Sequence, residues 1–127
     1  MGNAIGNRRV IAVVPAYNER DNIVSTIEDL QTNAPGVDYV IVNDGSKDDT
    51  LDICREHGYN VVDLPVNLGL AGAFQTGMRY AHEHDYDYAI QFDADGQHSA
   101  AYIEEMVKVA ENKGANIVIG SRFATQK

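Results

Sequence analysis

Short apolar runs alternate with longer stretches whose apolar residues recur every three or four positions, and this alternation limits the possible folds more than any other feature. The short runs are rich in β-branched residues, which is typical of strands, whereas the longer stretches have the period of amphipathic helices. Apolar strands separated by helices favour a mainly parallel sheet that helices cover on both faces. The sequence therefore predicts an α/β fold, with strands at 10–14, 39–42, 61–62, 88–92 and 117–119.

Helices are predicted between these strands. Their apolar faces carry Ile23, Ile27 and Leu30; Leu51 and Cys54; Leu70, Ala73, Phe74, Gly77, Met78 and Ala81; and Ile103, Met106, Val107 and Ala110. Asp48 and Ser99 have side chains that favour the N-cap position of a helix. Gly58 follows the predicted helix that carries Leu51 and Cys54, at the position where a glycine commonly ends a helix. Cys54 falls on an apolar face, so we expect it in the core.

The size and charge of the chain limit its organisation and its partners. With 127 residues, 44% of them hydrophobic, the sequence predicts a flexible N-terminus at 1–7 and one α/β domain at 8–127. A net charge of −9 disfavours nucleic acid, and a small anionic ligand would need clustered basic residues or a divalent metal beside it. One cysteine and no signal-peptide pattern indicate a cytoplasmic protein.

Polar and turn-forming residues gather where four of the predicted strands end. In open parallel sheets, ligands bind beyond the carboxyl ends of the strands, so these segments predict a binding site at one edge of the sheet. The segments are 15–19 (PAYNE), 43–49 (NDGSKDD), 93–98 (DADGQH) and 120–122 (GSR).

Asp93 and Asp95 are separated by one residue, so an extended backbone would project both carboxylates to the same side. Gln97 adds a carbonyl oxygen two residues later, and His98 would join if the metal were softer. Hard oxygen ligands suit Mg²⁺ or Mn²⁺. The alternative is a simple turn, because Asp and Gly are common turn residues.

Three further residues each have two interpretations. Tyr17 either covers the end of the sheet or stacks on a nucleobase. Asp44 accepts from a following N–H in an Asx turn, or from a base or ribose, or both. Arg122 either pairs with Asp93 or Asp95 or binds phosphate oxygens.

Five segments together resemble the family 2 glycosyltransferases, notably the branch that transfers sugars to dolichol or polyprenyl phosphate. They occur in the order and at about the spacing of that family, over about residues 8 to 124. The resemblance implies a GT-A fold, a Rossmann-like three-layer sandwich that binds nucleotides. It also implies sugar transfer from a nucleotide diphosphate donor with inversion. The segments are 13–19 (VVPAYNE), 42–50 (VNDGSKDDT), 67–77 (NLGLAGAFQTG), 92–98 (FDADGQH) and 119–123 (IGSRF).

The same resemblance assigns expected roles to single residues. Asp95 is the metal ligand expected first, with Asp93 and Gln97 beside it and Mn²⁺ or Mg²⁺ as the cofactor. The expected substrates are a UDP- or GDP-linked sugar and, as one acceptor of this branch, a polyprenyl phosphate at the cytoplasmic face of a membrane. The expected donor-binding residues are Pro15, Ala16, Tyr17, Glu19, Asp44, Asp93 and Arg122.

The resemblance leaves the catalytic base unidentified. Family members with hydroxyl acceptors carry a general-base carboxylate beyond the matched region, so the sequence predicts a donor half with a truncated sheet and weak turnover alone. A phosphate acceptor is already anionic and needs no base. Self-association over a sheet edge and a non-catalytic nucleotide- or partner-binding domain of the same fold remain open. A receiver domain is disfavoured, because Tyr17-Asn18-Glu19 stands where its acidic pair would follow the first strand.

Overall fold

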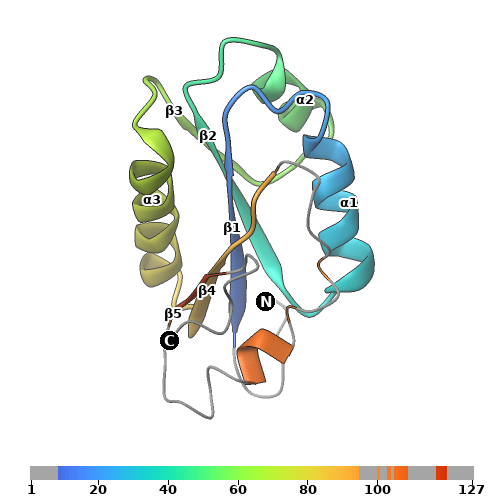
Figure 1. Ribbon diagram of the computed structural model, residues 1–127, viewed down its shortest axis with the longest axis vertical. Coiled ribbons are helices and arrows are strands. Elements are labelled where there is room, and N and C mark those ends of the chain that lie inside the picture. Colours follow the sequence, from blue (N-terminus) through green and yellow to red (C-terminus); the bar gives the residue numbers. More distant parts are fainter. Residues whose placement is uncertain (1–8, 95–99, 101–102, 104, 109–116, 120–127) are drawn as a thin grey trace.

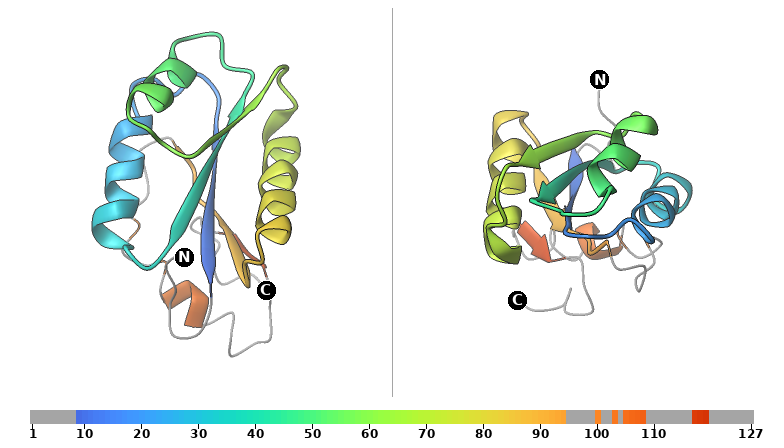
Figure 2. Two further views of the ribbon diagram at one scale, coloured as in Figure 1. Left: turned by 180° about the vertical axis from the view of Figure 1, so that it is seen from behind. Right: turned by 90° about the horizontal axis from the view of Figure 1, so that it is seen from above.

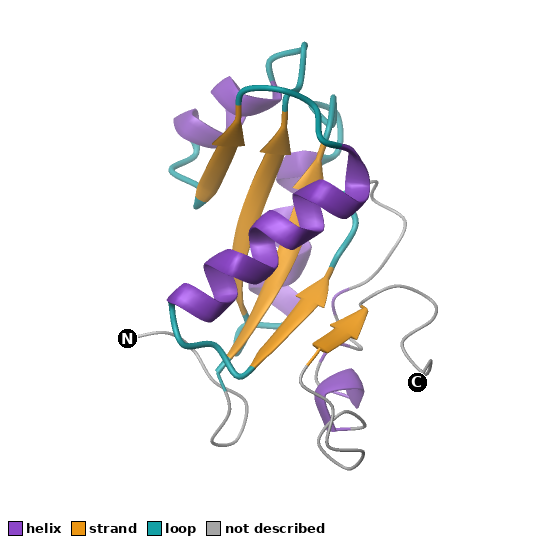
Figure 3. Ribbon diagram, turned by 90° about the vertical axis from the view of Figure 1, so that its left-hand side faces the viewer, coloured by secondary structure: helices purple, strands orange, loops and turns teal. Residues whose placement is uncertain are grey.

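The computed structural model describes residues 9–94, 100, 103, 105–108 and 117–119. Within these residues, five strands form one sheet in the order β3-β2-β1-β4-β5, and every pair of neighbours is parallel (Figures 1 and 3). The sequence order therefore reverses at β1, which has β2 on one side and β4 on the other. The strands are β1 (Val10–Ala16), β2 (Asp38–Asp44), β3 (Val61–Leu64), β4 (Tyr88–Gln91) and β5 (Ile117–Ile119).

Helices cover both faces of the sheet, as the sequence predicts. Helix α3 (Gly69–Glu83) packs on one face, and α1 (Ile23–Asn33) and α2 (Thr50–Glu56) lie on the other (Figures 1 and 2). Residues 105–108 are also helical. The view from above shows the sheet as the middle of three layers (Figure 2). No helix in the described ranges is long and apolar enough to cross a membrane.

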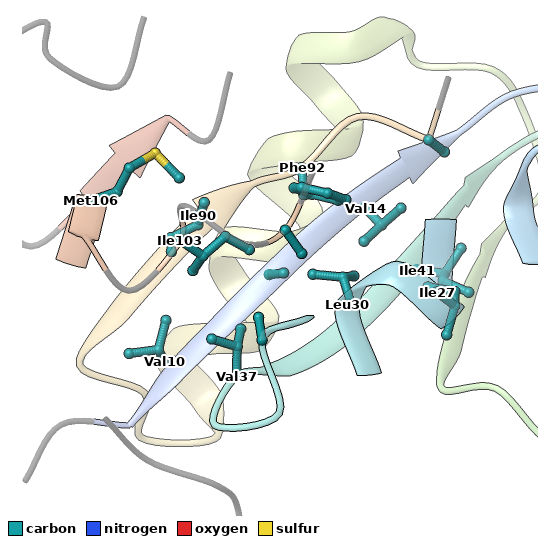
Figure 4. Close-up of a cluster of buried hydrophobic side chains, with 14 of the residues drawn as sticks. Val10, Val14, Ile27, Leu30, Val37, Ile41, Ile90, Phe92, Ile103 and Met106 are labelled. Atoms are coloured by element: carbon teal, nitrogen blue, oxygen red, sulfur yellow. The ribbon is translucent and has the colours of Figure 1, made fainter. Parts of the chain in front are cut away.

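Central strand β1 is buried on both faces, which explains its uninterrupted apolar sequence. Val10 and Val14 belong to the cluster on the α1 side, whereas Ile11 and Val13 belong to the cluster under α3. Figure 4 shows the larger cluster, in which Ile27, Leu30, Ile90, Phe92 and Ile103 contribute to the packing. Each large apolar side chain buried there contributes roughly 1.5–3 kcal/mol relative to exposure. The core therefore lies in two layers around the sheet.

Close approach of α3 to the sheet depends on one small residue. A Cβ added at Gly77 would lie 2.2 Å from Cγ1 of Val13. Glycine at this position therefore lets the helix backbone rest directly on β1. This contact fixes the axis of α3, whose N-terminus reaches the carboxyl edge of the sheet.

Several element boundaries differ from the sequence prediction. β1 and β2 each continue two residues further, through Ala16 and Asp44, so residues expected in loops are held by strand pairing. β4 ends one residue early, although the N–H of Phe92 still donates to the Val13 carbonyl (2.8 Å). The N-cap of α2 is Asp49 and not Asp48. Asp48 stands one residue before the cap, and its carboxylate accepts the N–H of Thr50, the first helical residue.

Candidate functional site

A cavity of about 340 Å³ opens at the carboxyl ends of β1, β2 and β4, where the strand order reverses. Such switch points are the usual ligand crevices of open parallel sheets. Six residues that the sequence singles out are brought together here, from three separate segments. The lining residues are Pro15, Ala16, Tyr17, Glu19, Asp44, Asn67, Gly69, Leu70, Asp93 and Ala94.

The remaining predicted site residues, Asp95, Gln97 and Arg122, lie outside the described residues, as does the N-terminal segment 1–7. Asp93 is half-buried at the end of β4, where one carboxylate oxygen accepts a hydrogen bond from the Gln91 amide (3.0 Å). Within the described ranges, no group of three or more His, Cys, Asp or Glu residues is arranged to hold a metal ion. The metal site therefore stays a prediction.

Asp44 is almost fully buried (3% exposed), and its carboxylate caps the start of α3. Oδ1 accepts the N–H of Leu68 (2.7 Å), and Oδ2 accepts the N–H of Gly69 (3.0 Å). The Asn67 side-chain amide donates to Oδ2 (3.1 Å) and to the Asp44 carbonyl (3.0 Å). The partners of the carboxylate all come from residues 67–69, so its described hydrogen bonds support a helix cap and not an Asx turn. The unpaired N–H groups of a helix N-terminus attract a carboxylate strongly.

Gly45 holds the turn after β2 against the loop that precedes α3. Its φ is +69°, and a Cβ there would lie 2.6 Å from the backbone N of Asn67 and 2.7 Å from the carbonyl carbon of Val66. Only glycine allows this approach of two backbones. The wall of the cavity around Asn67 is consequently fixed by both a buried carboxylate and direct backbone packing.

Asn18 joins the loops that follow β1 and β2. It adopts a left-handed conformation (φ +54°), which asparagine tolerates better than most residues. Its N–H donates to Ser46 Oγ (2.9 Å), and its side-chain oxygen accepts the N–H groups of Lys47 (2.8 Å) and Asp48 (3.3 Å). Asn18 thereby positions its two neighbours, Tyr17 and Glu19, at the cavity.

Asp48 and Thr50 complete this connection. The N–H of Glu19 donates to the Thr50 hydroxyl oxygen (3.0 Å), and that hydroxyl donates to the Asp48 carboxylate. Partial burial acts to raise the pKa of Asp48, but hydrogen bonds from the hydroxyl and N–H of Thr50 and from the N–H of Arg20 outweigh it. The pKa of Asp48 therefore lies below its usual value. Asp48 is ionised at neutral pH and holds the two loops together.

The described lining carries three carboxylates, on Glu19, Asp44 and Asp93, and no lysine or arginine. The Asp44 charge is offset by the N-terminus of α3. A diphosphate entering this cavity would be repelled unless a cation accompanied it. The lining contributed by the described residues is therefore acidic.

Two residues at the site were not identified from their chemistry in the sequence. Asn67 braces Asp44, although the sequence marks it only as the first residue of the segment 67–77. The helical period places Leu70 on the apolar face of its predicted helix. Leu70 is instead 58% exposed and lines the cavity, because the first turn of α3 lies beside the cavity and not over the sheet. In the sequence, the N-x-G pattern at residues 67–69 is the signal that marks the start of this helix.

Comparison with protein families and curated proteins agrees with the motifs. The model of the family described as glycosyl transferase family 2 matches residues 11–127. An uncharacterized protein of Methanocaldococcus jannaschii is 38% identical over 95% of this chain and 49% of its own length. The UDP-N-acetylglucosamine–dolichyl-phosphate N-acetylglucosaminyltransferase of Methanococcus voltae is 31% identical over 97% of this chain and 55% of its own. The undecaprenyl-phosphate mannosyltransferase of Micrococcus luteus is 31% identical over 90% and 48%. The chain spans about half the length of these relatives.

Solved structures confirm the predicted fold. The mannosyltransferase PcManGT from Pyrobaculum calidifontis, in complex with GDP-Man and Mn²⁺, superposes with a TM-score of 0.70 at 22% identity, over 85% of this chain and 34% of its own. Glucosyl-3-phosphoglycerate synthase from Mycobacterium tuberculosis, with Mn²⁺ and UDP-glucose, gives a TM-score of 0.60 at 25% identity, over 84% and 39%. The described sheet and its helices are therefore part of a GT-A fold.

Proposed function

The chain belongs to glycosyl transferase family 2, and we propose that it forms the donor-binding part of an enzyme that transfers a sugar from a nucleotide diphosphate to an acceptor phosphate. One observation carries this proposal. The cavity at the switch point gathers Pro15, Ala16, Tyr17, Glu19, Asp44 and Asp93, which the family resemblance names as donor-binding residues. The parallel sheet brings these strand ends together, and the residue types found there are those expected for a donor site.

The walls of the cavity suit a nucleoside. Tyr17 is 41% exposed at the mouth, so its ring offers a face on which a base can stack. Asp44 uses three of about four acceptor positions on its carboxylate for α3 and Asn67, which leaves one for a ribose hydroxyl or a base N–H. The donor base is either uracil or guanine, since the two structural neighbours bind UDP-glucose and GDP-Man.

The carboxylate-rich lining suits a divalent metal. Asp93, Asp95 and Gln97 are the residues proposed to hold Mn²⁺ or Mg²⁺, and oxygen ligands of this kind fit both ions. Both structural neighbours contain Mn²⁺. Such an ion, when bound, offsets the charge of the diphosphate as it leaves. Arg122 is proposed to contact the phosphate oxygens as well.

The proposed acceptor is a polyprenyl phosphate, as the names of the Methanococcus and Micrococcus relatives state for those proteins. An oxygen of the acceptor phosphate forms a bond to the anomeric carbon while the bond from that carbon to the diphosphate breaks, and the configuration inverts. A phosphate oxygen is anionic near neutral pH, so no general base is needed. The reaction would take place at the cytoplasmic face of a membrane, where such lipids present their phosphate.

Calorimetric titration of UDP and GDP, with and without Mn²⁺, tests the donor site. We expect one nucleotide to bind in a metal-dependent manner and Asp93→Asn to weaken that binding by at least about tenfold, because a neutral amide is a poorer ligand. Asp85→Asn is the matched control. Asp85 is exposed near the amino end of β4, and its φ of +62° is one that asparagine tolerates.

Two results would contradict the proposal. Neither nucleotide binding to the folded chain, with or without Mn²⁺, would remove the donor site and favour a domain of this fold with another role. Equal weakening by Asp93→Asn and Asp85→Asn would show that the effect comes from net charge and not from the cavity. An Asp95→Ala variant extends the same test to the residue expected to be the first metal ligand.

A further inference from the structure

A carboxylate on α1 holds the backbone just after the segment 93–98. Oδ2 of Asp29 accepts the N–H of Ala100 (2.8 Å), a residue 71 positions away in the sequence. Oδ1 of the same carboxylate accepts the side-chain amide of Asn33 (2.6 Å), one turn later on α1. Both oxygens are held, so the direction of the bond to Ala100 is fixed. None of the residues proposed to bind the donor takes part in this contact.

Apolar packing brings the same part of the chain against α1. Ala100 and Ile103 are fully buried, in the same cluster as Leu30 of α1 (Figure 4). Burial of apolar surface is non-directional, so it holds two elements together without fixing how far one is shifted along the other. A hydrogen bond to a carboxylate supplies that direction, because it weakens steeply when donor and acceptor move out of line.

Two fixed residues therefore stand on either side of two proposed metal ligands. On one side, Ala94 follows the carboxyl end of β4 and is buried in the same core cluster. On the other side, Ala100 is held by Asp29. Asp95 and Gln97 lie between these residues in the sequence. The piece of chain that carries both proposed ligands thus has one end set by β4 and the other set, through one hydrogen bond, by α1.

We propose that Asp29 is a positioning residue for the metal site, and that it acts through its hydrogen bond to the backbone of Ala100. The inference rests on the proposed function, since Asp93, Asp95 and Gln97 are the ligands proposed there. Asp29 is not among the described residues that line the cavity, so it is not itself a ligand. Metal–oxygen distances tolerate errors of only about 0.2 Å, so a shift at one end of the segment lowers metal affinity.

The test compares two substitutions of Asp29 by their effect on Mn²⁺ affinity. Asp29→Ala removes the acceptor of the Ala100 N–H, whereas Asp29→Asn removes the charge but keeps an oxygen that can accept it. Mn²⁺ is titrated into the chain with UDP or GDP present, and free Mn²⁺ is measured by electron paramagnetic resonance. Each nucleotide is also titrated without metal. Glu28→Ala is the matched control, because it removes one carboxylate from an exposed position of the same helix.

We expect Asp29→Ala to bind Mn²⁺ about tenfold more weakly than the wild-type chain, the lower end of the range for groups that orient metal ligands. Asp29→Asn should stay within about threefold of wild type, because the hydrogen bond is kept. Glu28→Ala should stay within about twofold, since an exposed charge is screened. Nucleotide affinity without metal should be the same in every variant, because neither residue lines the cavity.

Two further variants separate positioning from a general loss of stability. Asn33→Ala is an exposed substitution that leaves the Asp29 acceptor in place but unbraced, so Mn²⁺ affinity should fall by about threefold. Tyr86→Phe removes a hydrogen bond at the opposite edge of the sheet and should leave Mn²⁺ affinity unchanged. Equal weakening by Tyr86→Phe and Asp29→Ala would show that only stability matters and would overturn the proposal.

Three other results would also count against it. Equal weakening by Asp29→Asn and Asp29→Ala would assign the effect to charge and not to the hydrogen bond. Wild-type binding that Asp93→Asn weakens and Asp29→Ala leaves unchanged would overturn this inference alone. Absence of Mn²⁺ binding to the wild-type chain with either nucleotide would overturn the proposed metal site as well, so the two failures are distinguishable.

Discussion

The two ends of the sheet carry cavities of nearly equal size whose polar groups are paired differently. The cavity at the carboxyl ends measures about 340 Å³, and one at the amino ends measures about 320 Å³. The second is lined by Gln31, Pro35, Val37, Asp38, Tyr39, Asn60 and Tyr86. Volume therefore does not separate a candidate site from a surface hollow, and the difference must lie in how the lining groups are paired.

Polar groups at the amino end bind mainly to one another. The Tyr86 hydroxyl donates to the Asp38 carboxylate (2.6 Å), and the Asn60 amide donates to the Tyr80 hydroxyl (3.1 Å). Arg9 stacks over the Tyr86 ring at 4.3 Å and donates to the His84 carbonyl (2.7 Å). These contacts close the base of the sheet. We interpret this end as structural.

The carboxyl end combines a rigid frame with exposed binding groups. Asp44 and Asn18 use their polar atoms to fix loops, whereas Tyr17 and Leu70 stay exposed over the cavity. The two ends therefore differ in that a braced backbone at the carboxyl end leaves Tyr17 and Leu70 exposed over a cavity that carries three carboxylates. Substitutions at the two ends should therefore differ in their effect on nucleotide binding.

The largest effect is expected from Asp44→Asn. The amide would present its NH₂ group to helix N–H donors, so a charge-assisted cap is lost and a buried donor is left unpaired. We expect the free energy of unfolding to fall by about 2–3 kcal/mol, measured by urea denaturation. Nucleotide binding should weaken in parallel. Asp52→Asn, at an exposed position in the first turn of α2, should change stability by less than about 1 kcal/mol; an equally small effect at Asp44 would contradict the cap.

Asn18 is expected to show the next largest effect. Asn18→Ala removes the acceptor for the Lys47 and Asp48 N–H groups and places alanine at a positive φ, so we expect a loss of about 1–2 kcal/mol and about fivefold weaker nucleotide binding. Asn18→Gly removes the same hydrogen bonds without the strain and should recover part of the stability but not the affinity. Full recovery of both would show that only the backbone conformation matters.

Tyr86→Phe tests the amino end. Loss of the hydroxyl leaves Asp38 without the hydrogen bond at 2.6 Å, so we expect about 0.5–1.5 kcal/mol less stability. Nucleotide affinity should be unchanged, because Tyr86 lies at the opposite edge of the sheet. A clear loss of affinity in this variant would break the distinction between a structural and a functional end.

A further, pH-dependent effect is expected in alkaline solution. Burial, and then the hydrogen bond to Asp38, raise the pKa of Tyr86 from 10.0 to about 12. The folded state thus holds this proton more tightly than the unfolded state, so the stabilisation is complete below pH 10 and is lost between about pH 10 and 12. Tyr86→Phe should flatten the stability profile in that window. In Tyr86→Phe, absorbance at tyrosinate wavelengths should show one tyrosine fewer that ionises at high pH than in the wild-type chain.

Local pattern was sufficient to predict most of the fold. All five predicted strands occur within the described residues, and Cys54 is buried, where its surroundings raise the pKa of its thiol to about 11. The strand ends were less accurate. Pairing with neighbouring strands extended β1 and β2 into segments that read as turns, because Pro, Asn and Asp are poor strand formers without such pairing.

The sequence by itself determined that the polar segments meet at one edge, since parallel strands all place their carboxyl ends there and each segment follows a strand. Only the tertiary structure decided what those residues do. Asp44 caps a helix that begins 25 residues later, and Leu70 faces a cavity in spite of its helical period. The physical reason is that periodicity reports one element at a time, whereas capping and exposure depend on where the end of one element lies relative to the next.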